Sequence, residues 1–216
     1  MITTLKNKLL FTYTLTLLII GLVAVGCYLF LSKPTDKTTA TIRIETVETA
    51  RLSLDGTNVK ILASVNDFST SRNFIFQNLQ SGDTITTLSV SSLGLETPSY
   101  QIIKGVKHDW LVINKVETWG TGFRQDVDEW YITSSQGKAK LVLSYPAQTL
   151  QVPNSSNKNE YTETEILKIT DDSNVAIKTV QKLCSVKEDG TDKDCKESPT
   201  TNHYIWSEEK EEFELK

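Results

Sequence analysis

The uncharged segment from Leu9 to Ser32 constrains this chain more than any other feature of its sequence. Lys6 and Lys8 precede the segment, and Lys33 ends it. A helix needs roughly 20 apolar residues to cross the hydrocarbon core, at ~1.5 Å of rise per residue. The segment therefore predicts one transmembrane helix, and the polar remainder of the chain predicts a domain beside the membrane.

Residues 1–32 are expected to form a short cytoplasmic tail and an uncleaved signal anchor, followed by a polar linker over residues 33–40. The apolar core of a secretory signal is normally ~7–15 residues, which is shorter than this run. Positive charge before the helix favours a cytoplasmic N-terminus. The sequence therefore predicts a single-pass protein of the cell membrane whose C-terminal domain is extracytoplasmic.

Two alternatives involve cleavage of the same segment. Ala24-Val25-Gly26-Cys27 resembles the bacterial lipobox, which would make Cys27 a lipidated N-terminal residue. Residues 28–31 are apolar, whereas lipoproteins usually carry a polar tether at that place. An ordinary signal cleaved after Gly26 would leave the same apolar stretch exposed. The uncleaved anchor is therefore the leading interpretation.

Composition narrows the class of the remaining domain. Without the membrane flanks, 19 of the 23 basic residues and 26 of the 27 acidic residues remain, for a net charge of −7. A net acidic domain without basic clusters is not expected to bind nucleic acid or to dock on anionic lipid. Abundant Thr, Ser, Val and Ile favour strands. We expect a mostly β fold, either an antiparallel β-sandwich or two small β modules over residues 41–116 and 117–216.

The segment Ala50–Ile61 carries the clearest hairpin signal. Asp55-Gly56 favours a two-residue type I′ turn, since both central residues of that turn need a positive φ. This register places Leu52 opposite Val59 and makes one face of the ribbon mostly apolar.

Other strands are expected wherever apolar or alternating runs lie between turn residues. Trp119–Phe123, which contains two glycines, is a candidate boundary between the two modules. The expected strands cover Asn73–Phe76, Thr84–Val90, Tyr100–Ile103, Trp110–Val116, a Trp130–Ser144 hairpin over Gln136-Gly137, Ile166–Thr170, Val175–Leu183, Tyr204–Trp206 and Phe213–Leu215.

The segment TARLSLDGTNVKI resembles the start of a PEGA domain, a small β module of bacterial and archaeal surface proteins. LQSGDTITTLSVSSLGLETPSYQI is similar to the second half of that module, with Gly94 and Leu95 where Gly-Tyr would stand. The resemblance covers about residues 41–105, although the Pro-Gly-Ala lead and the Gly-x-Thr-Pro turn of the family are missing. It implies a surface module for attachment or scaffolding without catalysis, and it transfers no site residues.

Cys184 and Cys195 lie outside the apolar run and are expected to form a disulfide, because an exported domain meets oxidising conditions. A two-residue turn at Asp189-Gly190 would place the two cysteines directly opposite each other. The acidic residues around this turn could also form a calcium loop, but their spacing does not match the EF-hand pattern. With two histidines and no CxxC, no metal site is expected, and no motif indicates a cofactor.

A second cluster, from His108 to Tyr131, gathers three of the four tryptophans of the chain beside several carboxylates. Aromatic rings beside carboxylates are typical of a sugar-binding face or a glycosidase cleft. Large aromatics at the start of apolar strands are also typical of a β core. The candidate ligand face consists of Trp110, Trp119, Asp126, Asp128, Glu129, Trp130 and Tyr131.

No nucleophile, phosphate-binding or zinc-protease motif occurs in the sequence. The leading functional hypothesis is therefore a non-catalytic surface component for binding, adhesion or envelope scaffolding. Its ligand would be a protein or a carbohydrate outside the cell. A carbohydrate-active hydrolase or sugar-binding domain using the cluster at 119–131, and an accessory subunit of a membrane-bound assembly, are the alternatives.

Overall fold

The structure is a computed structural model that describes residues 42–66, 70–152, 158–170, 172–188 and 190–216. These residues form strands and no helix, which confirms the mostly β expectation. The strands are β1 (Ile42–Ala50), β2 (Val59–Asn66), β3 (Ser71–Asn78), β4 (Thr84–Ser91), β5 (Ser99–Ile103), β6 (Trp110–Gly120), β7 (Phe123–Thr133), β8 (Ala139–Gln151), β9 (Lys158–Thr170), β10 (Asn174–Val186), β11 (Asp192–Ser207) and β12 (Glu212–Leu215).

The predicted anchor over residues 1–32, with Cys27, and the predicted linker over 33–40 lie outside the described residues. Within the described part of the chain, no helix has the length and apolar character that crossing a membrane requires.

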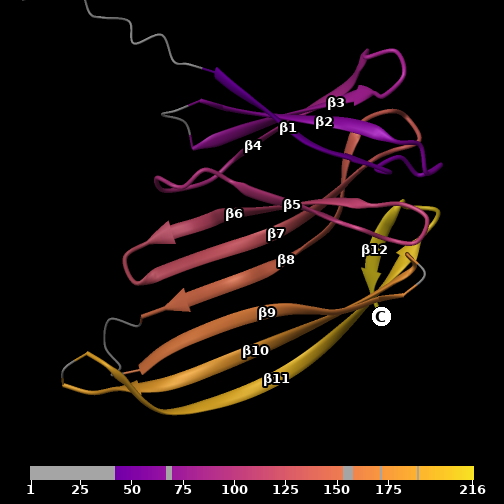
Figure 1. Ribbon diagram of the computed structural model, residues 1–216. Coiled ribbons are helices and arrows are strands. Elements are labelled where there is room, and N and C mark those ends of the chain that lie inside the picture. Colours follow the sequence, from indigo (N-terminus) through magenta and orange to yellow (C-terminus); the bar gives the residue numbers. More distant parts are fainter. Residues whose placement is uncertain (1–41, 67–69, 153–157, 171, 189) are drawn as a thin grey trace, which may run out of the picture. The chain divides into compact units, whose positions relative to one another are not determined.

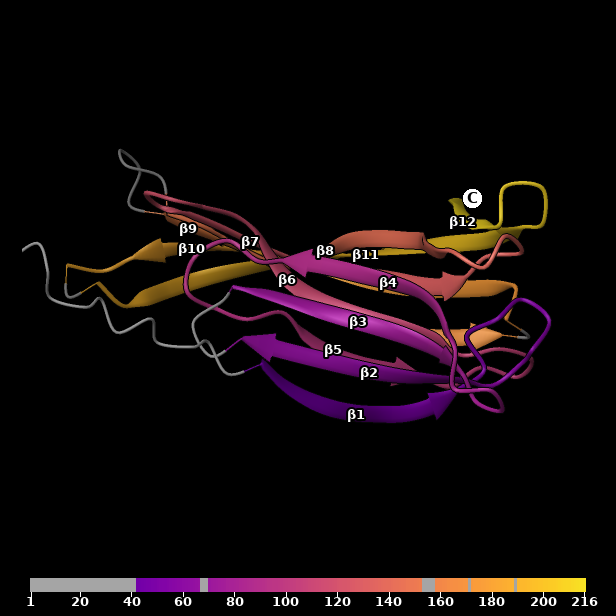
Figure 2. The ribbon, with the colours of Figure 1, turned by 90° about the horizontal axis from the view of Figure 1, so that it is seen from above.

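The strands form two antiparallel sheets in which each strand pairs with its neighbour in the chain. The smaller sheet has the order β1-β2-β3-β4, whose strands Figure 2 shows side by side. The larger sheet runs from β12 to β5 in reverse chain order. Trp119–Phe123, the candidate module boundary, contains the β6–β7 turn, so one sheet continues through it.

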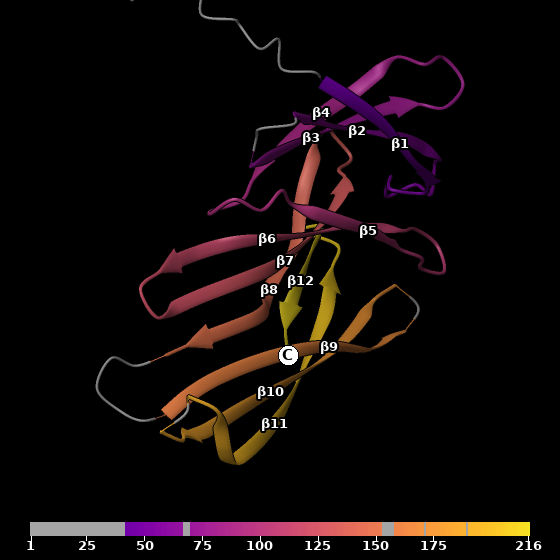
Figure 3. The same ribbon diagram turned by 60° about the vertical axis from the view of Figure 1, so that its left-hand side comes forward.

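The first half of β6 and the second half of β7 are buried on both faces because they contribute alternate residues to two cores. Leu111, Ile113 and Tyr131 pack against the smaller sheet in the first core. Trp110 and Trp130 belong to the second core, which β8, β10 and β12 complete. Figures 1 and 3 both show β5–β8 lying between β1–β4 and β9–β11. The unbroken apolar runs at the start of β6 and the end of β7 follow from this two-sided burial.

Two buried aspartates hold the β5–β6 loop against neighbouring elements. Asp172, in the β9–β10 turn, accepts hydrogen bonds from the backbone N–H groups of Val106, Lys107 and His108. The Asp172 carboxylate is 98% buried, and its backbone has a φ of 57°. A Cβ at Gly105 would collide with this carboxylate, so the close approach requires glycine there. We call this arrangement, with Asp109, the loop clamp.

Asp109 ties the same loop to Arg51, the first residue of the β1–β2 connection. It accepts hydrogen bonds from the Arg51 backbone N–H and from the Arg51 guanidinium, both at 2.9 Å. The guanidinium also donates to the carbonyl oxygens of Gly105 and Val106 at 2.7 Å. Despite the cost of burial, these donors and nearby Lys104 keep the pKa of Asp109 below its usual range.

The register of the Ala50–Ile61 segment differs from the two-residue turn expected for Asp55-Gly56. Ala50 pairs with Val59, and residues 51–58 form a longer connection between β1 and β2. The prediction of a turn was right, because the Gly56 N–H donates to the Ser53 carbonyl at 2.9 Å with Gly56 at positive φ. The register was wrong because Leu52 enters the core and its carbonyl accepts the Thr133 N–H, which takes it out of the hairpin ladder.

The disulfide between Cys184 and Cys195 joins β10 to β11, as the sequence predicts. The register beside it is shifted, since Val186 pairs with Asp192 and Leu183 pairs with Lys196. Asp194, at a φ of 51°, accommodates the extra residue as a bulge. The cysteines follow the Leu183–Lys196 pair and lie opposite each other, with Cα atoms 4.0 Å apart, so the register differs from that of a two-residue turn on the turn side of the bridge.

The loop clamp predicts that Asp172→Asn destabilises the domain. Asparagine tolerates a positive φ but replaces one charged acceptor oxygen with a donor, so at least one of three clamped N–H groups loses its partner. Hydrogen bonds to charged groups contribute about 1.5–3 kcal/mol each. Urea unfolding should show a loss of about 2–3 kcal/mol. Asp83→Asn, at an exposed turn, serves as the matched control, and equal stabilities for the two variants would contradict the clamp.

His108 should make stability depend on pH. Burial lowers its pKa below 6.5, against the opposing effects of Asp172, Asp109 and Glu208, while Arg51 lowers it further. The folded state therefore holds a neutral imidazole, and the unfolded state takes up a proton near pH 6.5. Above about pH 6.5, His108 is neutral in both states and the free energy of unfolding is highest. As the pH falls from 6.5 towards the pKa of His108 in the folded state, the free energy of unfolding decreases.

Urea midpoints between pH 7.5 and 5 test this dependence. The midpoint should fall with pH in the unmodified chain, and the fall should be smaller in His108→Gln. His203→Gln, on the exposed part of β11, should keep the full dependence. An unchanged slope in His108→Gln would show that another group is responsible.

Candidate functional site

The candidate ligand face between residues 110 and 131 is not assembled as one surface. Trp110 and Trp130 are fully buried in the second core, with ring centroids 5.5 Å apart. Tyr131 points to the first core on the opposite side of β7. Of the four aromatic residues, only Trp119 is exposed, with 56% of its surface accessible.

The three carboxylates of the cluster are divided between the two faces of β7 and each has partners. The Arg124 guanidinium donates to both oxygens of Asp126 at 2.8 and 2.9 Å. Asp128 accepts from the Asn114 amide at 2.8 Å and from the Tyr145 hydroxyl at 3.2 Å. These bonds orient both side chains on the face that carries Trp130.

Glu129 lies on the other face. Its carboxylate is 2.7 Å from the Lys115 ammonium and accepts the Tyr131 hydroxyl proton at 2.8 Å. Burial, then Glu129, raises the pKa of Tyr131 well above 10. The three carboxylates therefore do not converge on one cleft beside Trp119, which a glycosidase mechanism with a carboxylate pair would need.

Trp119 forms an exposed apolar patch with the β4–β5 loop. Gly94 packs on its ring, since a Cβ there would lie 3.5 Å from Trp119 Cε3. The adjacent Leu93 and Leu95 are 52% and 99% exposed. We call Leu93, Leu95 and Trp119 the Trp119 patch.

Charged groups form the rim of the Trp119 patch. The Arg124 guanidinium lies 5.3 Å from the centroid of the Trp119 ring and donates to both Glu96 oxygens at 2.7 Å. Arg124 holds the pKa of Glu96 below its usual value. The sequence singles out Trp119 but not Leu93, Leu95 or this ion pair. The reason is that the β4–β5 loop and β6 become neighbours only when the chain folds.

The patch continues along one row of the larger sheet. Trp119 is opposite Arg124 in the ladder, and Arg124 is opposite Leu150. Leu150 is opposite Tyr161, which continues the row to β9 and β10. Partners in adjacent strands share a face, so this row extends the surface on which Trp119 stands.

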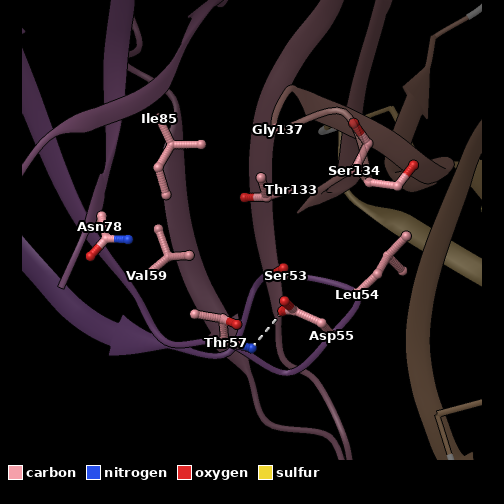
Figure 4. A pocket seen from close by; sticks show the side chains of 11 residues that line it. Ser53, Leu54, Asp55, Thr57, Val59, Asn78, Ile85, Thr133, Ser134 and Gly137 are labelled. Carbon is pink, nitrogen blue, oxygen red and sulfur yellow. Dashed lines mark hydrogen bonds between the residues drawn. The ribbon is translucent and has the colours of Figure 1, made fainter. Parts of the chain in front are cut away.

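A pocket of about 560 Å³ lies where the β1–β2 connection, β4 and the β7–β8 turn meet (Figure 4). Neither the aromatic cluster nor any motif predicted it. Asp55 on its rim accepts the Thr57 N–H at 2.8 Å. The hydroxyls of Ser53 and Thr57, together with this N–H, lower the pKa of Asp55 to about 2. The pocket is lined by Ser53, Leu54, Asp55, Thr57, Val59, Asn78, Ile85, Thr133, Ser134, Ser135 and Gly137.

In the described part of the chain, no three His, Cys, Asp or Glu side chains are grouped so that they could hold a metal ion. Near the disulfide, Asp192 accepts hydrogen bonds from Asn159 at 2.9 Å and from the Tyr161 hydroxyl at 2.6 Å. Asp189, part of the alternative calcium loop, lies outside the described residues.

Comparison of the chain with protein-family models, with curated proteins and with solved structures gives no match. The resemblance to PEGA modules over residues 41–105 therefore stays a prediction.

Proposed function

We propose that this chain is a membrane-anchored, extracytoplasmic β domain that acts as a non-catalytic surface-binding component. In this proposal the single apolar helix over residues 9–32 anchors the chain, the N-terminus is cytoplasmic and the Trp119 patch binds a protein outside the cell. The disulfide between Cys184 and Cys195 supports an oxidising location.

The exposure of the Trp119 patch carries the proposal. An almost fully exposed leucine beside a half-exposed tryptophan leaves apolar area in water that a partner could cover. Tryptophan and arginine are enriched among the residues that dominate protein interfaces. The Glu96–Arg124 pair would supply the polar rim of such an interface.

The environment of the carboxylates supports binding over hydrolysis. Asp126 and Glu129 are buried in ion pairs, and Asp128 is held by two hydrogen bonds. A general acid and a nucleophile need access to the same scissile bond. Glu129 lies on the opposite face of β7 from Asp126 and Asp128, and Asp126 is buried in its ion pair with Arg124.

Photo-crosslinking in intact cells tests the partner. A photoreactive phenylalanine analogue replaces Leu95 in the full chain, and the same analogue at Leu167 on β9, 49% exposed, is the matched control. Position 95 should give a protein adduct of defined mass that position 167 does not give. Adding Trp119→Ala should weaken the interaction by about 2 kcal/mol, roughly 30-fold, and remove the adduct.

Three results would contradict this assignment. One is the absence of an adduct at position 95, and another is an adduct that survives Trp119→Ala. An adduct whose added mass disappears with glycosidases would identify a carbohydrate instead of a protein as the ligand of the patch.

Intact mass of the membrane-extracted protein tests the anchor. The proposal predicts the full-length mass and a gain of two hydrogen atoms on reduction of the Cys184–Cys195 bridge. A mass that starts at Cys27 with added acyl chains would replace the spanning helix with a lipid anchor. A full-length mass that does not change on reduction would argue against an extracytoplasmic domain.

A further inference from the structure

The pocket beside Asp55, lined by the eleven residues given above, combines three walls from separate parts of the chain. Val59, Asn78 and Ile85 come from the smaller sheet, and residues 53–57 come from the β1–β2 connection. The third wall is the end of β7 with the β7–β8 turn (Figure 4). Its volume of about 560 Å³ falls within the range of small-molecule sites.

Hydrogen-bonding groups dominate the lining of the Asp55 pocket. Five of the lining residues carry a hydroxyl, one carries an amide and one a carboxylate, and no basic side chain lines the pocket. Hydroxyl groups both donate and accept, whereas the carboxylate only accepts. The Asn78 carbonyl oxygen accepts the N–H groups of Gln80 and Ser81, so its amide nitrogen is the donor that this side chain offers. The pocket thus offers donors and acceptors together.

Thr133 adds an unpartnered polar group. Its side chain is buried, with 4% of the residue exposed, and its Oγ1 has no hydrogen-bond partner among the described residues. Figure 4 shows this hydroxyl directed towards Val59 and Ile85, into the pocket. The Thr133 backbone N–H donates to the Leu52 carbonyl at 2.7 Å, which fixes the position of the residue. A buried hydroxyl without a partner is costly, and a ligand hydroxyl would remove that cost.

One wall of the pocket is apolar. Val59 is almost fully buried, and Ile85 packs against the β7–β8 turn, where a Cβ on Gly137 would lie 3.7 Å from Ile85 Cγ2. These two side chains offer a surface for C–H groups, while Leu54 lies on another side of the pocket and packs against the second core (Figure 4). A sugar ring carries C–H groups on its faces and hydroxyls at its edge, and each hydroxyl both donates and accepts.

We propose that the Asp55 pocket binds a neutral sugar residue, with Asp55 and Thr133 bonded to its hydroxyls and Val59 and Ile85 against its ring. Asp55 disfavours anionic ligands, since its carboxylate stays ionised throughout the physiological pH range. A simple alkylammonium ion would pair with Asp55 but has no acceptor for the amide of Asn78. This site is separate from the Trp119 patch and does not depend on the function proposed for that patch.

Saturation-transfer NMR on the full chain in detergent tests the site, with the methyl glycosides of glucose, galactose, mannose and N-acetylglucosamine as probes. At least one of the four should bind, and Asp55→Asn and Thr133→Val should each weaken binding tenfold or more. Thr133→Val removes only the hydroxyl at nearly constant shape, so it separates loss of binding from loss of folding. Glu165→Gln, an exposed charge change on β9, is the matched control and should bind as the unmodified chain does.

The pH dependence gives a second readout. Because the pKa of Asp55 is about 2, sugar binding should be constant between pH 7 and about 4.5. Three outcomes would overturn the proposal: no binding of any of the four glycosides by folded protein, binding that both variants retain, or tighter binding of cadaverine than of every glycoside.

Discussion

Burial of the first half of β6 and the second half of β7 on both faces is the constraint on which the other layers depend. Leu111 and Ile113 face the smaller sheet, while Trp110 and Val112, one residue away, face the second core. Neither the smaller sheet nor the strands that contribute Val175 and Phe213 could cover their apolar side chains without this shared layer. The loop clamp fixes the layer at one end, because Asp109 bonds to Arg51 and Asp172 bonds to the loop that leads into β6.

The same constraint decides where ligands could bind. Two-sided burial takes Trp110, Trp130 and Tyr131 into the cores. Glu129 is paired with Lys115, and Asp126 is paired with Arg124. The two surfaces proposed for binding lie at the ends of the shared layer. The Trp119 patch lies at the β6–β7 turn, and the Asp55 pocket lies at the opposite end of β7, beside Thr133.

Much of the fold could be predicted from local patterns, but the sites could not. Runs such as Trp110–Ile113 identify strands, and oxidising export predicts the bridge between Cys184 and Cys195. The register after Ala50 could not be predicted, because Leu52 is drawn into the core. The clamp joins backbone N–H groups to an aspartate about 65 residues away in the sequence, and no spacing rule reports such a contact.

Hydrogen–deuterium exchange of the full chain, read by mass spectrometry, tests the central role of the shared layer most directly. Backbone amides in residues 110–116 of β6 and 127–133 of β7 should exchange slowest, at the rate of global unfolding, because their strands are covered on both faces. Residues 192–201 of β11, whose side chains are all exposed, should exchange much faster. Equal protection of these segments would contradict the account, because β6 and β7 would then not be the layer on which the others depend.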